Sequence, residues 1–362
     1  MGSIFKILIT IFMLFGLFAC KKQISDSSEH YYSKSGEIYF IPEGNSFERG
    51  QRKVDADPET FSVIKNLFAR DKSTLFYEGC PQTMVDLETF RLRNNIPMDK
   101  NHVYFGKNSV SVSANCAEQQ LQIVPNADPN SYEKIDDVKE FWARDNAHFF
   151  YHHTIVDVDY PSFVLLSTYF AEDKNKVYAI ASKSLIPLNY RFEKVELLGA
   201  HYLLLDRSKL LYYDRYQEIG LREWDVVTTN DVELLDKFTL RIDHKIIYKG
   251  KSFAASNVDP ISFEVLTKNS NYSFWAKDAS HVFYNEKQLP NADPATFEVL
   301  HYAIAKDANH VYIEDRIAEG IDAASFKKIA EIESPKYDFI DGTGRKYRYK
   351  IADKKPSLVT VP

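Results

Sequence analysis

The sequence predicts a mostly β protein, built as a tandem repeat array of short hairpins with one helical turn in each repeat. Aromatic residues, which favour strands, make up 14% of the chain. An Asp-led turn followed by an apolar and an aromatic residue recurs, as in DKNHVYF at 99–105 and DANHVY at 307–312. An Asp-Pro segment lies between such turns, as in DPETF at 57–61 and DPATF at 293–297. A β-propeller is the alternative architecture, because four strands in each repeat would also suit a propeller blade.

The first 19 residues have the pattern of a bacterial export signal. Lys6 precedes an apolar run at 7–19 that is too short to cross a bilayer as a helix but suits the core of a signal peptide. The run ends in LFAC at 17–20, which resembles the lipobox of bacterial lipoproteins. We therefore expect 1–19 to be a lipoprotein signal peptide and Cys20 to carry the lipid. The alternative is a plain secretory signal followed by a chance Cys.

The segment that follows the expected lipid is polar and rich in Ser. This composition predicts a flexible tether over residues 20–36. More than one acyl chain on Cys20, such as palmitate, would give stable anchoring, because each buried methylene contributes about 0.8 kcal/mol. Lys21 follows the Cys, whereas an Asp at this position would favour retention at the inner membrane. We therefore expect a lipid-anchored protein of the bacterial cell envelope, at the outer membrane.

The charge pattern excludes a nucleic-acid partner. Without residues 1–19 the chain has 44 basic against 51 acidic residues, a net charge of −7, since Lys6 is the only charged residue removed. Positive and negative residues are interspersed, and no block of Lys and Arg offers a surface for phosphates. The expected partners are the membrane, through the lipid, and an envelope protein or glycan.

Two cysteines remain after the expected lipidation. Cys80 and Cys116 form an even remainder in an oxidising compartment, which favours a disulfide. Such a bridge would close a loop of 37 residues, which stabilises a fold by about 3–4 kcal/mol in the chain-entropy model. Two unrelated thiols are the alternative.

The repeat is defined by aligned columns. The leading Asp occurs at Asp71, Asp99, Asp145, Asp173, Asp206, Asp243, Asp278 and Asp307, in steps of 28, 46, 28, 33, 37, 35 and 29 residues. The fourth residue after each Asp is always apolar, and the fifth is aromatic in seven of the eight copies, as at Tyr104, Tyr178, Phe283 and Tyr312. Chance would not keep both columns uniform, so the pattern predicts one structural unit repeated in series.

Each column has a physical reason. An Asp accepts hydrogen bonds from backbone amides ahead of it and so favours a turn. The apolar and aromatic residues then predict a short strand that returns through a hairpin. Asp-Pro predicts the cap and first residue of a helical turn. One unit cannot bury its own aromatic face, so we expect stacked repeats over 37–350, followed by a loose tail at 351–362.

The combination of Asp-Lys-Asn-x-Val-Tyr with a downstream Asp-Pro-x-Thr-Phe resembles the DKNYY repeat family of bacterial envelope proteins. The resemblance covers roughly residues 54–330. The copies at Asp206 and Asp243 depart from the pattern because they lack the Asn. The resemblance implies a repeat architecture and implies no catalytic residue.

Three patterns could suggest a metal, and we interpret each as structural. His102, His148, His281 and His310 share one column, but equivalent positions in a repeat need not converge on one ion. His152 and His153 are adjacent, so in a strand they would point to opposite faces. The paired oxygens before Pro, such as Asn291 and Asp293, suit calcium, which needs six or more such ligands, but Asx turns and capping explain them.

No recognised catalytic or cofactor motif occurs. The chain has no Gly-x-Ser-x-Gly elbow, no Walker loop, no His-Glu-x-x-His and no Rossmann glycine pattern, so we predict no cofactor and no catalytic residue. We therefore expect a protein that acts by binding or scaffolding. The alternative is an envelope polysaccharide hydrolase whose acidic residues line a groove of the array, because carboxylate pairs of glycosidases have no sequence motif.

Overall fold

The computed structural model describes residues 22–42, 50–106, 116–135, 141–190, 192–214, 220–226, 232–268, 270, 274–329, 338–352 and 355–361. The chain divides into two compact units, residues 1–160 and 161–362, which we describe separately. Both units consist almost entirely of short strands, and the described ranges contain no α-helix. The prediction of a mostly β repeat protein is confirmed.

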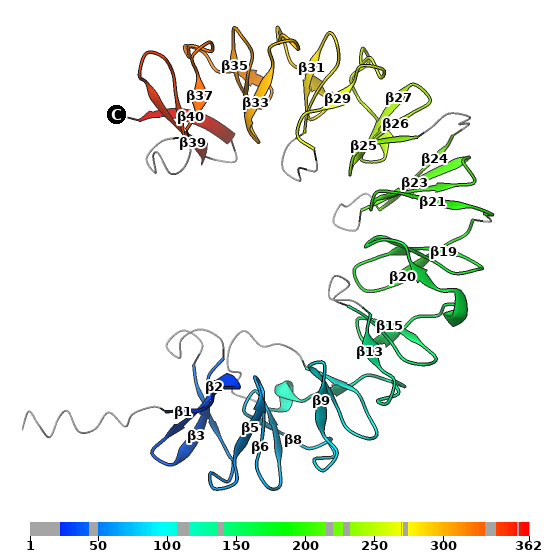
Figure 1. Ribbon diagram of the computed structural model, residues 1–362, viewed down its shortest axis with the longest axis vertical. Helices are drawn as coiled ribbons and strands as arrows, with labels where there is room; N and C mark the ends of the chain where they lie inside the picture. Colours follow the sequence, from blue (N-terminus) through cyan, green and yellow to red (C-terminus); the bar gives the residue numbers. More distant parts are fainter. Residues whose placement is uncertain are drawn as a thin grey trace, which may run out of the picture. The chain divides into compact units, whose positions relative to one another are not determined.

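The repeating element is a four-stranded antiparallel sheet in which each strand pairs with the next strand along the chain (Figure 1). In unit 1 the first sheet consists of β1 (Lys22–Ser25), β2 (Ser28–Lys34), β3 (Glu37–Phe40) and β4 (Arg52–Val54). The second sheet consists of β5 (Ser62–Lys65), β6 (Phe68–Arg70), β7 (Leu75–Tyr77) and β8 (Cys80–Gln82). The last sheet consists of β13 (Glu133–Lys134), β14 (Trp142–Arg144), β15 (Phe149–Tyr151) and β16 (Thr154–Ile155). Between them lie two strand pairs, β9 (Arg91–Arg93) with β10 (Ile96–Met98) and β11 (Tyr104–Phe105) with β12 (Gln122–Ile123), joined by a bridge from Met98 to Val103.

The described residues of unit 2 form six sheets of the same kind. The first sheet consists of β17 (Val164–Leu165), β18 (Phe170–Glu172), β19 (Val177–Ile180) and β20 (Leu185–Leu188). The second consists of β21 (Val195–Leu198), β22 (Tyr202–Leu205), β23 (Lys209–Tyr213) and β24 (Leu221–Asp225). The third consists of β25 (Glu233–Asp236), β26 (Thr239–Ile242), β27 (Lys245–Tyr248) and β28 (Lys251–Ser252). The fourth sheet consists of β29 (Glu264–Val265), β30 (Trp275–Lys277), β31 (Val282–Tyr284) and β32 (Lys287–Gln288). The fifth consists of β33 (Glu298–His301), β34 (Ile304–Lys306), β35 (Val311–Ile313) and β36 (Arg316–Ile317). The last consists of β37 (Lys327–Lys328), β38 (Phe339–Ile340), β39 (Lys346–Ala352) and β40 (Lys355–Val361).

In a sheet that lies between two others, the third strand is buried on both faces, which explains the repeated apolar-aromatic pair. In β31, Phe283 packs in the core shared with the preceding sheet, while Val282 and Tyr284 pack in the core shared with the following sheet. Successive side chains of a strand point to opposite faces, so a sheet between two neighbours needs apolar residues at every position. Each pair of neighbouring sheets within a unit therefore has its own core, such as that of Tyr31, Phe40 and Phe76 between the first two sheets.

A small residue in the second strand makes room for the repeated aromatic ring. Ala276 pairs directly with Phe283 and is fully buried. The same pairing of a small and a large residue occurs for Ala69 with Phe76, Ala143 with Phe150, Ala171 with Tyr178 and Ala305 with Tyr312. The pairing fills the space between sheets without overpacking, as close-packed interiors require.

The prediction of a helical turn in every repeat is not supported. At the Asp-Pro segment 57–61 the chain makes one turn, with the amide of Thr60 donating to the carbonyl of Asp57 at 3.3 Å, and β5 begins at once. A turn this short cannot propagate as a helix, because a helix needs several successive backbone bonds to offset its nucleation. Within the described ranges the only 3₁₀ helices are η2 (Cys116–Gln119) and η3 (Tyr160–Ser162), and neither lies at an Asp-Pro segment.

The expected tether at 20–36 is wrong for its described part. Residues 22–25 and 28–34 form β1 and β2 of the first sheet. Tyr31 lies in the middle of this polar stretch, is fully buried, and donates a 2.8 Å hydrogen bond to the carbonyl of Leu67. One buried aromatic residue and the strand pairing therefore fix a segment that composition alone marks as flexible.

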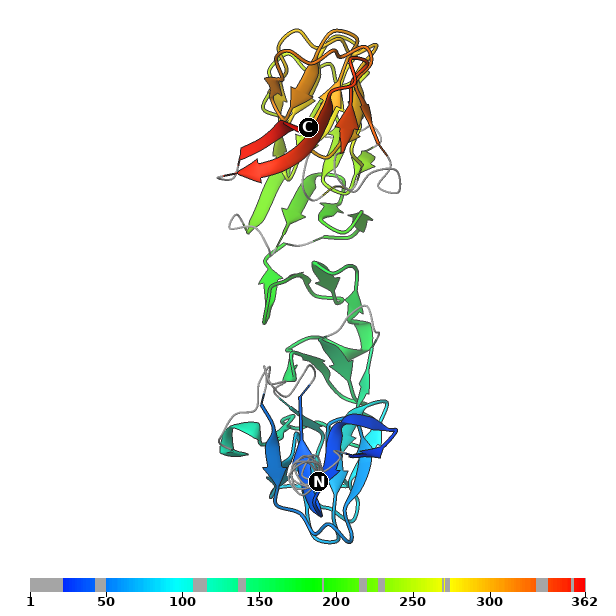
Figure 2. The same cartoon turned by 90° about the vertical axis from the view of Figure 1, so that its left-hand side faces the viewer.

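The expected loose tail at 351–362 is also wrong for the residues that the structure describes, 351–352 and 355–361. β40 pairs with β39 over seven residue pairs and forms the longest hairpin of unit 2, drawn in red in Figure 2. Leu358 and Tyr349 pack against the last core, beside Tyr347. Pro356 is tolerated because β40 is an edge strand, which has one side without a ladder partner. The repeat domain therefore extends past the expected limits of 37–350, from β1 to β40.

No helix in the described part of the chain is long and apolar enough to cross a membrane.

Candidate functional site

The two ends of each sheet carry different turns. In β5–β8, the Asp-Pro turn 57–60 and the loop 71–74 lie at one end, which we call the anchor edge. The turns 66–67 and 78–79 lie at the other end, which we call the variable edge. This division follows from antiparallel order, because the turns after the first and third strands meet at the end opposite to the turn after the second.

The leading Asp of each repeat holds the anchor edge together. One carboxylate oxygen of Asp99 accepts the amides of Asn101 and His102 at 2.7 and 2.8 Å. The other accepts the amide of Asp86 at 2.9 Å and the hydroxyl of Tyr104 at 2.5 Å. Asp99 is only 1% exposed, so these four donors replace the water that a carboxylate needs.

The same arrangement recurs in both units. The leading carboxylate binds two amides of its own loop and one amide of the preceding Asp-Pro turn at Asp71, Asp145, Asp278 and Asp307. A Tyr hydroxyl also donates to the carboxylate at Asp173 (from Tyr178) and at Asp307 (from Tyr312). These residues of the repeat therefore serve the fold.

The Asp-Pro turn makes a reciprocal contact. The hydroxyl of Thr296 donates to Asp293 at 2.7 Å and accepts the amide of Ala308 in the next loop at 3.1 Å. The amide of Asp293 in turn donates to Asp307 at 3.0 Å. Turn and loop thus fix one another through two hydrogen bonds in opposite directions, which explains why the Ser or Thr recurs with the Asp.

These hydrogen bonds also set the acidity of the leading carboxylates. Burial alone would raise the pKa of Asp307, because it disfavours the charged form. The amides of Asp293, Asn309 and His310 and the hydroxyl of Tyr312 outweigh burial, and the pKa of Asp307 lies below its ordinary value. The pKa values of Asp71, Asp99, Asp278 and Asp341 are lowered in the same way.

Two of the eight Asp residues do not take this role. Asp206 is exposed, and its carboxylate binds the amides of Glu193 and Lys194, which precede it. Asp243 and His244 form a two-residue hairpin turn with φ of 47° and 56°, and Asp243 is partly exposed. The columns after Asp243 are shifted by one residue, because Ile247 faces the preceding core and Tyr248 the following one. Both copies lack the Asn of the repeat, but so do the copies at Asp71 and Asp278, whose carboxylates take the leading role.

The His column lies beside the leading carboxylates. The ring Nδ1 of each His lies 3.2 to 4.0 Å from an oxygen of its own loop Asp, at His102, His148, His281 and His310. Each His belongs to a different repeat. Across the ranges that the structure describes, no group of three or more His, Cys, Asp and Glu side chains could hold a metal ion.

The structure joins Cys80 to Cys116 in a disulfide with 5.3 Å between the Cα atoms. The bond ties η2 to β8 in unit 1. Gln82 adds two hydrogen bonds, because its side chain donates to the carbonyl of Gln119 at 3.1 Å and accepts the amide of Leu121 at 2.7 Å. The expected lipidation site, Cys20, lies outside the described residues.

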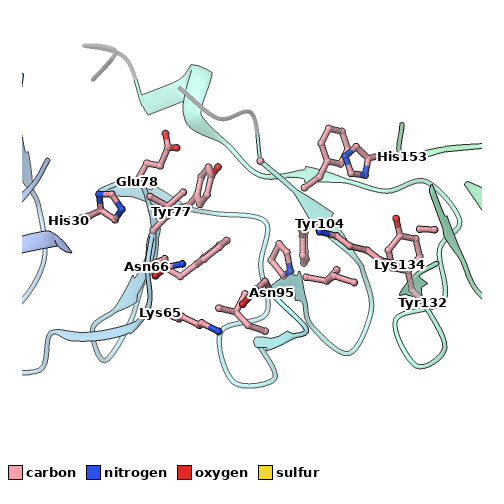
Figure 3. Close-up of a pocket in the computed structure, with 18 of the residues that line it drawn as sticks. His30, Lys65, Asn66, Tyr77, Glu78, Asn95, Tyr104, Tyr132, Lys134 and His153 are labelled. Carbon is pink, nitrogen blue, oxygen red and sulfur yellow. The ribbon is translucent and has the colours of Figure 1, made fainter. Parts of the chain in front are cut away.

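A groove of about 500 Å³ runs along the variable edge of unit 1. Its labelled side chains follow one another from His30 and Glu78 at one end, past Tyr104 and Asn95, to Lys134 and His153 at the other (Figure 3). They come from four successive parts of the unit, the sheets β1–β4 and β5–β8, the pairs β9–β12 and the sheet β13–β16. An extended ligand could therefore contact all four.

Two ring stacks stand at one end of the groove. The ring of His153 lies flat on Phe105, with centroids 4.1 Å apart and planes 9° apart. The ring of His152 lies on Phe141, with centroids 4.0 Å apart and planes 17° apart. The two His form the turn between β15 and β16 with φ of 49° and 64°, so they lie in a turn and not in a strand as expected. Phe141 is 47% exposed and thus offers an open aromatic surface.

The charges of the groove are mostly positive. Lys65 and Lys134 are exposed, and neither forms an ion pair within the described ranges. Burial lowers the pKa of His153, and the positive charges of His152 and Lys134 lower it further. Glu78 is the one carboxylate of the described lining, and it is buried. Burial lowers the pKa of Arg52, whereas the negative charge of Glu78 raises it. The groove therefore offers two accessible cations.

A buried Tyr fixes the turn that carries Glu78. The hydroxyl of Tyr31 donates to the carbonyl of Leu67 at 2.8 Å and accepts the amide of Gly79 at 3.1 Å. Gly79 has φ of 74°, and a Cβ there would lie 2.6 Å from Cβ of Phe40. Unit 2 repeats this corner with Tyr202, Phe238 and Gly250, where Lys249 stands in the place of Glu78. The same backbone thus carries opposite charges in the two units.

The sequence interpretation missed several residues of both edges. Asp86 and Asp322 occupy the place of the Asp in an Asp-Pro turn, although no Pro follows them. Asp341 acts as a leading Asp, and its carboxylate accepts a hydrogen bond from the hydroxyl of Tyr347 at 2.6 Å. A relaxed pattern, Asp followed three residues later by Ser or Thr and then an aromatic residue, would have found the first two. The groove residues Phe141 and Lys134 carry no sequence signal, because the residue types at the equivalent positions differ from repeat to repeat.

Comparisons with known proteins agree with the repeat. The model of the DKNYY family matches residues 6–109 and 142–316. A comparison with curated protein sequences found no match. Among solved structures, the crystal structure of BamB from Moraxella catarrhalis is similar over 81% of this chain and 92% of that chain, with 10% sequence identity and a TM-score of 0.17, which is too low to argue from. Since the family model covers most of the chain, the protein belongs to the DKNYY family.

Proposed function

We propose that the protein is a lipid-anchored repeat protein of the bacterial cell envelope, at the outer membrane, that binds an extended envelope glycan in the groove of unit 1. The anchor is Cys20 at the end of the signal peptide 1–19. The proposal of export rests on the sequence pattern of residues 1–20. The proposal of binding rests on the groove.

The observation that carries the proposal is the division of labour between the two edges. The recurring residues of the anchor edge, such as Asp307 and Thr296, use their polar groups within the fold. The groove lies instead on the variable edge, where the turns differ between copies and where Asn66, Asn95 and His153 line one opening. Binding sites combine such convergent polar groups with aromatic side chains.

The groove favours binding over catalysis. A glycosidase of the usual kind needs two carboxyl groups about 5–9.5 Å apart across the scissile bond. The described lining of the groove includes one carboxylate, Glu78, which is buried beside Arg52. The hydrolase alternative therefore has no observation in its favour, and we propose no catalytic residue.

We propose further that the sheets continue as an open tandem array and do not close into a propeller. The uneven steps between leading Asp residues support this, because a closed ring favours blades of equal size. Small-angle X-ray scattering tests the proposal. An open array gives a radius of gyration well above that of a compact propeller of the same mass, and a compact value would contradict it.

Binding is tested with polysaccharide extracted from envelopes of the producing bacterium. The fluorescence of Trp142, which lines the groove, reports binding. We expect Phe141→Ala to weaken binding at least about fivefold, since loss of one stacking platform costs about 1–3 kcal/mol. The control is Ile261→Ala, an exposed apolar residue of unit 2. Equal loss in both variants, or no binding by the unaltered protein, would overturn the proposed function.

A further inference from the structure

We propose that the groove of unit 1 selects an acidic saccharide, a chain of pyranose rings that carry carboxylates. This inference rests on the proposed function and adds the chemical class of the ligand. It comes from three features that line the same opening, namely two accessible lysines, two flat aromatic stacks and two exposed amide side chains. Each feature matches a different part of such a sugar.

The lysines define the charge of the ligand. Lys65 ends β5 and Lys134 ends β13, so the two cations belong to sheets that are not neighbours along the unit. Neither has an ion-pair partner within the described ranges, and Glu78 is buried beside Arg52. Cations without local partners favour an anionic ligand. Two separated cations favour a ligand with charges at intervals along its length.

The ring stacks define its shape. Phe105 with His153 and Phe141 with His152 present flat surfaces of stacked rings at the groove. A pyranose has an apolar face of C–H groups that packs on such a surface, whereas its hydroxyls point outward. The exposed side of Phe141 is free to receive one, since 47% of the residue is accessible. Stacking of this kind tolerates different linkages and suits a repetitive polymer.

The amides provide partners for hydroxyl groups. Asn66 and Asn95 are exposed in equivalent turns of neighbouring repeats, with φ of 47° and 63°, and both line the groove. The left-handed conformation is common for Asn and holds each turn in place. An amide both donates and accepts, so it can bind the hydroxyl of a sugar in either sense. An acidic peptide would make fewer contacts with these two amides and with the ring stacks than a sugar chain would.

The test compares two forms of one probe. Hexagalacturonate is a chain of uronic acids, and its fully methyl-esterified form has the same rings without charge. We expect the protein to bind the acid about tenfold more tightly than the ester at low salt, and the preference to shrink as salt screens the charges. Trp142 fluorescence and isothermal titration calorimetry measure both affinities.

Two matched variants locate the effect. Lys65→Gln with Lys134→Gln should remove the preference for the acid and leave the affinity for the ester unchanged. Lys72→Gln with Lys100→Gln removes the same charge from the anchor edge, where both lysines pair with Asp residues, and should keep the preference. Thermal melting checks that both pairs fold. A preference that survives the groove substitutions, or that both pairs abolish equally, would overturn the inference.

The outcomes separate this inference from the proposed function. If the protein binds envelope polysaccharide but neither form of the probe up to millimolar concentration, the acidic class is wrong and glycan binding stands. If acid and ester bind equally and Phe141→Ala weakens both, the groove binds sugars without selecting charge, which also contradicts the acidic class. If nothing binds, both proposals fail.

Discussion

The buried hydroxyl of Tyr312 donates a 2.9 Å hydrogen bond to the buried carboxylate of Asp307, five residues earlier. The same carboxylate holds the amides of Asn309 and His310 and reaches back to the amide of Asp293. One side chain thus joins a loop, a strand and the preceding turn. The leading Asp recurs because it closes a repeat, and this role is testable by substitution.

We expect Asp307→Asn to lower the free energy of unfolding by about 2–4 kcal/mol, because it weakens several charge-assisted hydrogen bonds and places an amide donor against amide donors. Urea unfolding followed by fluorescence measures the change. Asp225→Asn is the control, since the Asp225 side chain is 87% exposed and its ion pair with Lys209 should contribute less than about 1 kcal/mol. Equal effects of the two substitutions would contradict the structural role of Asp307.

Stability should fall steeply in acid. The pKa values of Asp71, Asp99, Asp278, Asp307 and Asp341 lie below the ordinary value, and an unfolded Asp titrates near about 3.9. A lowered pKa stabilises the folded chain above the unfolded pKa, and this stability is lost as the pH falls through the folded pKa. Urea midpoints should therefore be steady from pH 7 to 5 and drop below about pH 4. A midpoint that stays constant down to pH 3 would contradict the proposed role of these carboxylates.

Overfilling the space opposite a repeated ring should destabilise the stack. Ala276 is fully buried against Phe283, so Ala276→Leu should cost about 1–3 kcal/mol or more. Ala295→Leu is a matched control, because Ala295 is exposed in its turn and the equivalent position of another repeat holds the exposed Ile261. Thermal melting should separate the two variants clearly. A tolerated Leu at 276 would show that neighbouring sheets do not share a tight core.

The disulfide should stabilise unit 1. Cys80 and Cys116 are 36 residues apart in the chain, and a loop of this size corresponds to about 3–4 kcal/mol. Cys116→Ser should therefore lower the melting temperature, and a reducing agent should lower that of the unaltered protein without affecting the variant further. A melting temperature that is insensitive to both changes would show that Gln82 and its two hydrogen bonds hold η2 in place by themselves.

Membrane attachment depends on Cys20 in the proposed function. Cys20→Ser should release the protein from the membrane fraction into the soluble envelope fraction, because no acyl chain can then be attached. Immunoblotting of both fractions measures the distribution. A variant that stays with the membranes to the same extent would contradict the lipid anchor.

Much of the fold could be predicted from the sequence, because its signals are local. The turn at Asp99, the strand that begins at Tyr104 and the repetition along the chain all follow from residues close together in sequence. The errors have one cause, which is that composition does not report long-range partners. Residues 28–34 look like a tether, yet Tyr31 reaches Leu67, and the last residues look like a tail, yet β40 completes a sheet.

The groove could not be predicted from the sequence. Its lining comes from positions whose residue types differ between repeats, so no recurring residue type marks Lys65, Lys134 or Phe141. They share only an edge, and that edge is defined by strand order. The repeated motif therefore helped to locate the site by exclusion, because its polar groups are used by the fold and the variable turns are left for a ligand.

The central claim is that the repeated residues fold the protein and the variable edge of unit 1 binds. Hydroxyl-radical footprinting of the full chain, with and without envelope polysaccharide, tests it most directly, because it reports the accessibility of single side chains. We expect protection of Phe141 and His153, and unchanged reactivity of Met84 and Ile261, which are 62% and 75% exposed away from the groove. Protection of Met84 or Ile261 without protection of Phe141 would contradict it.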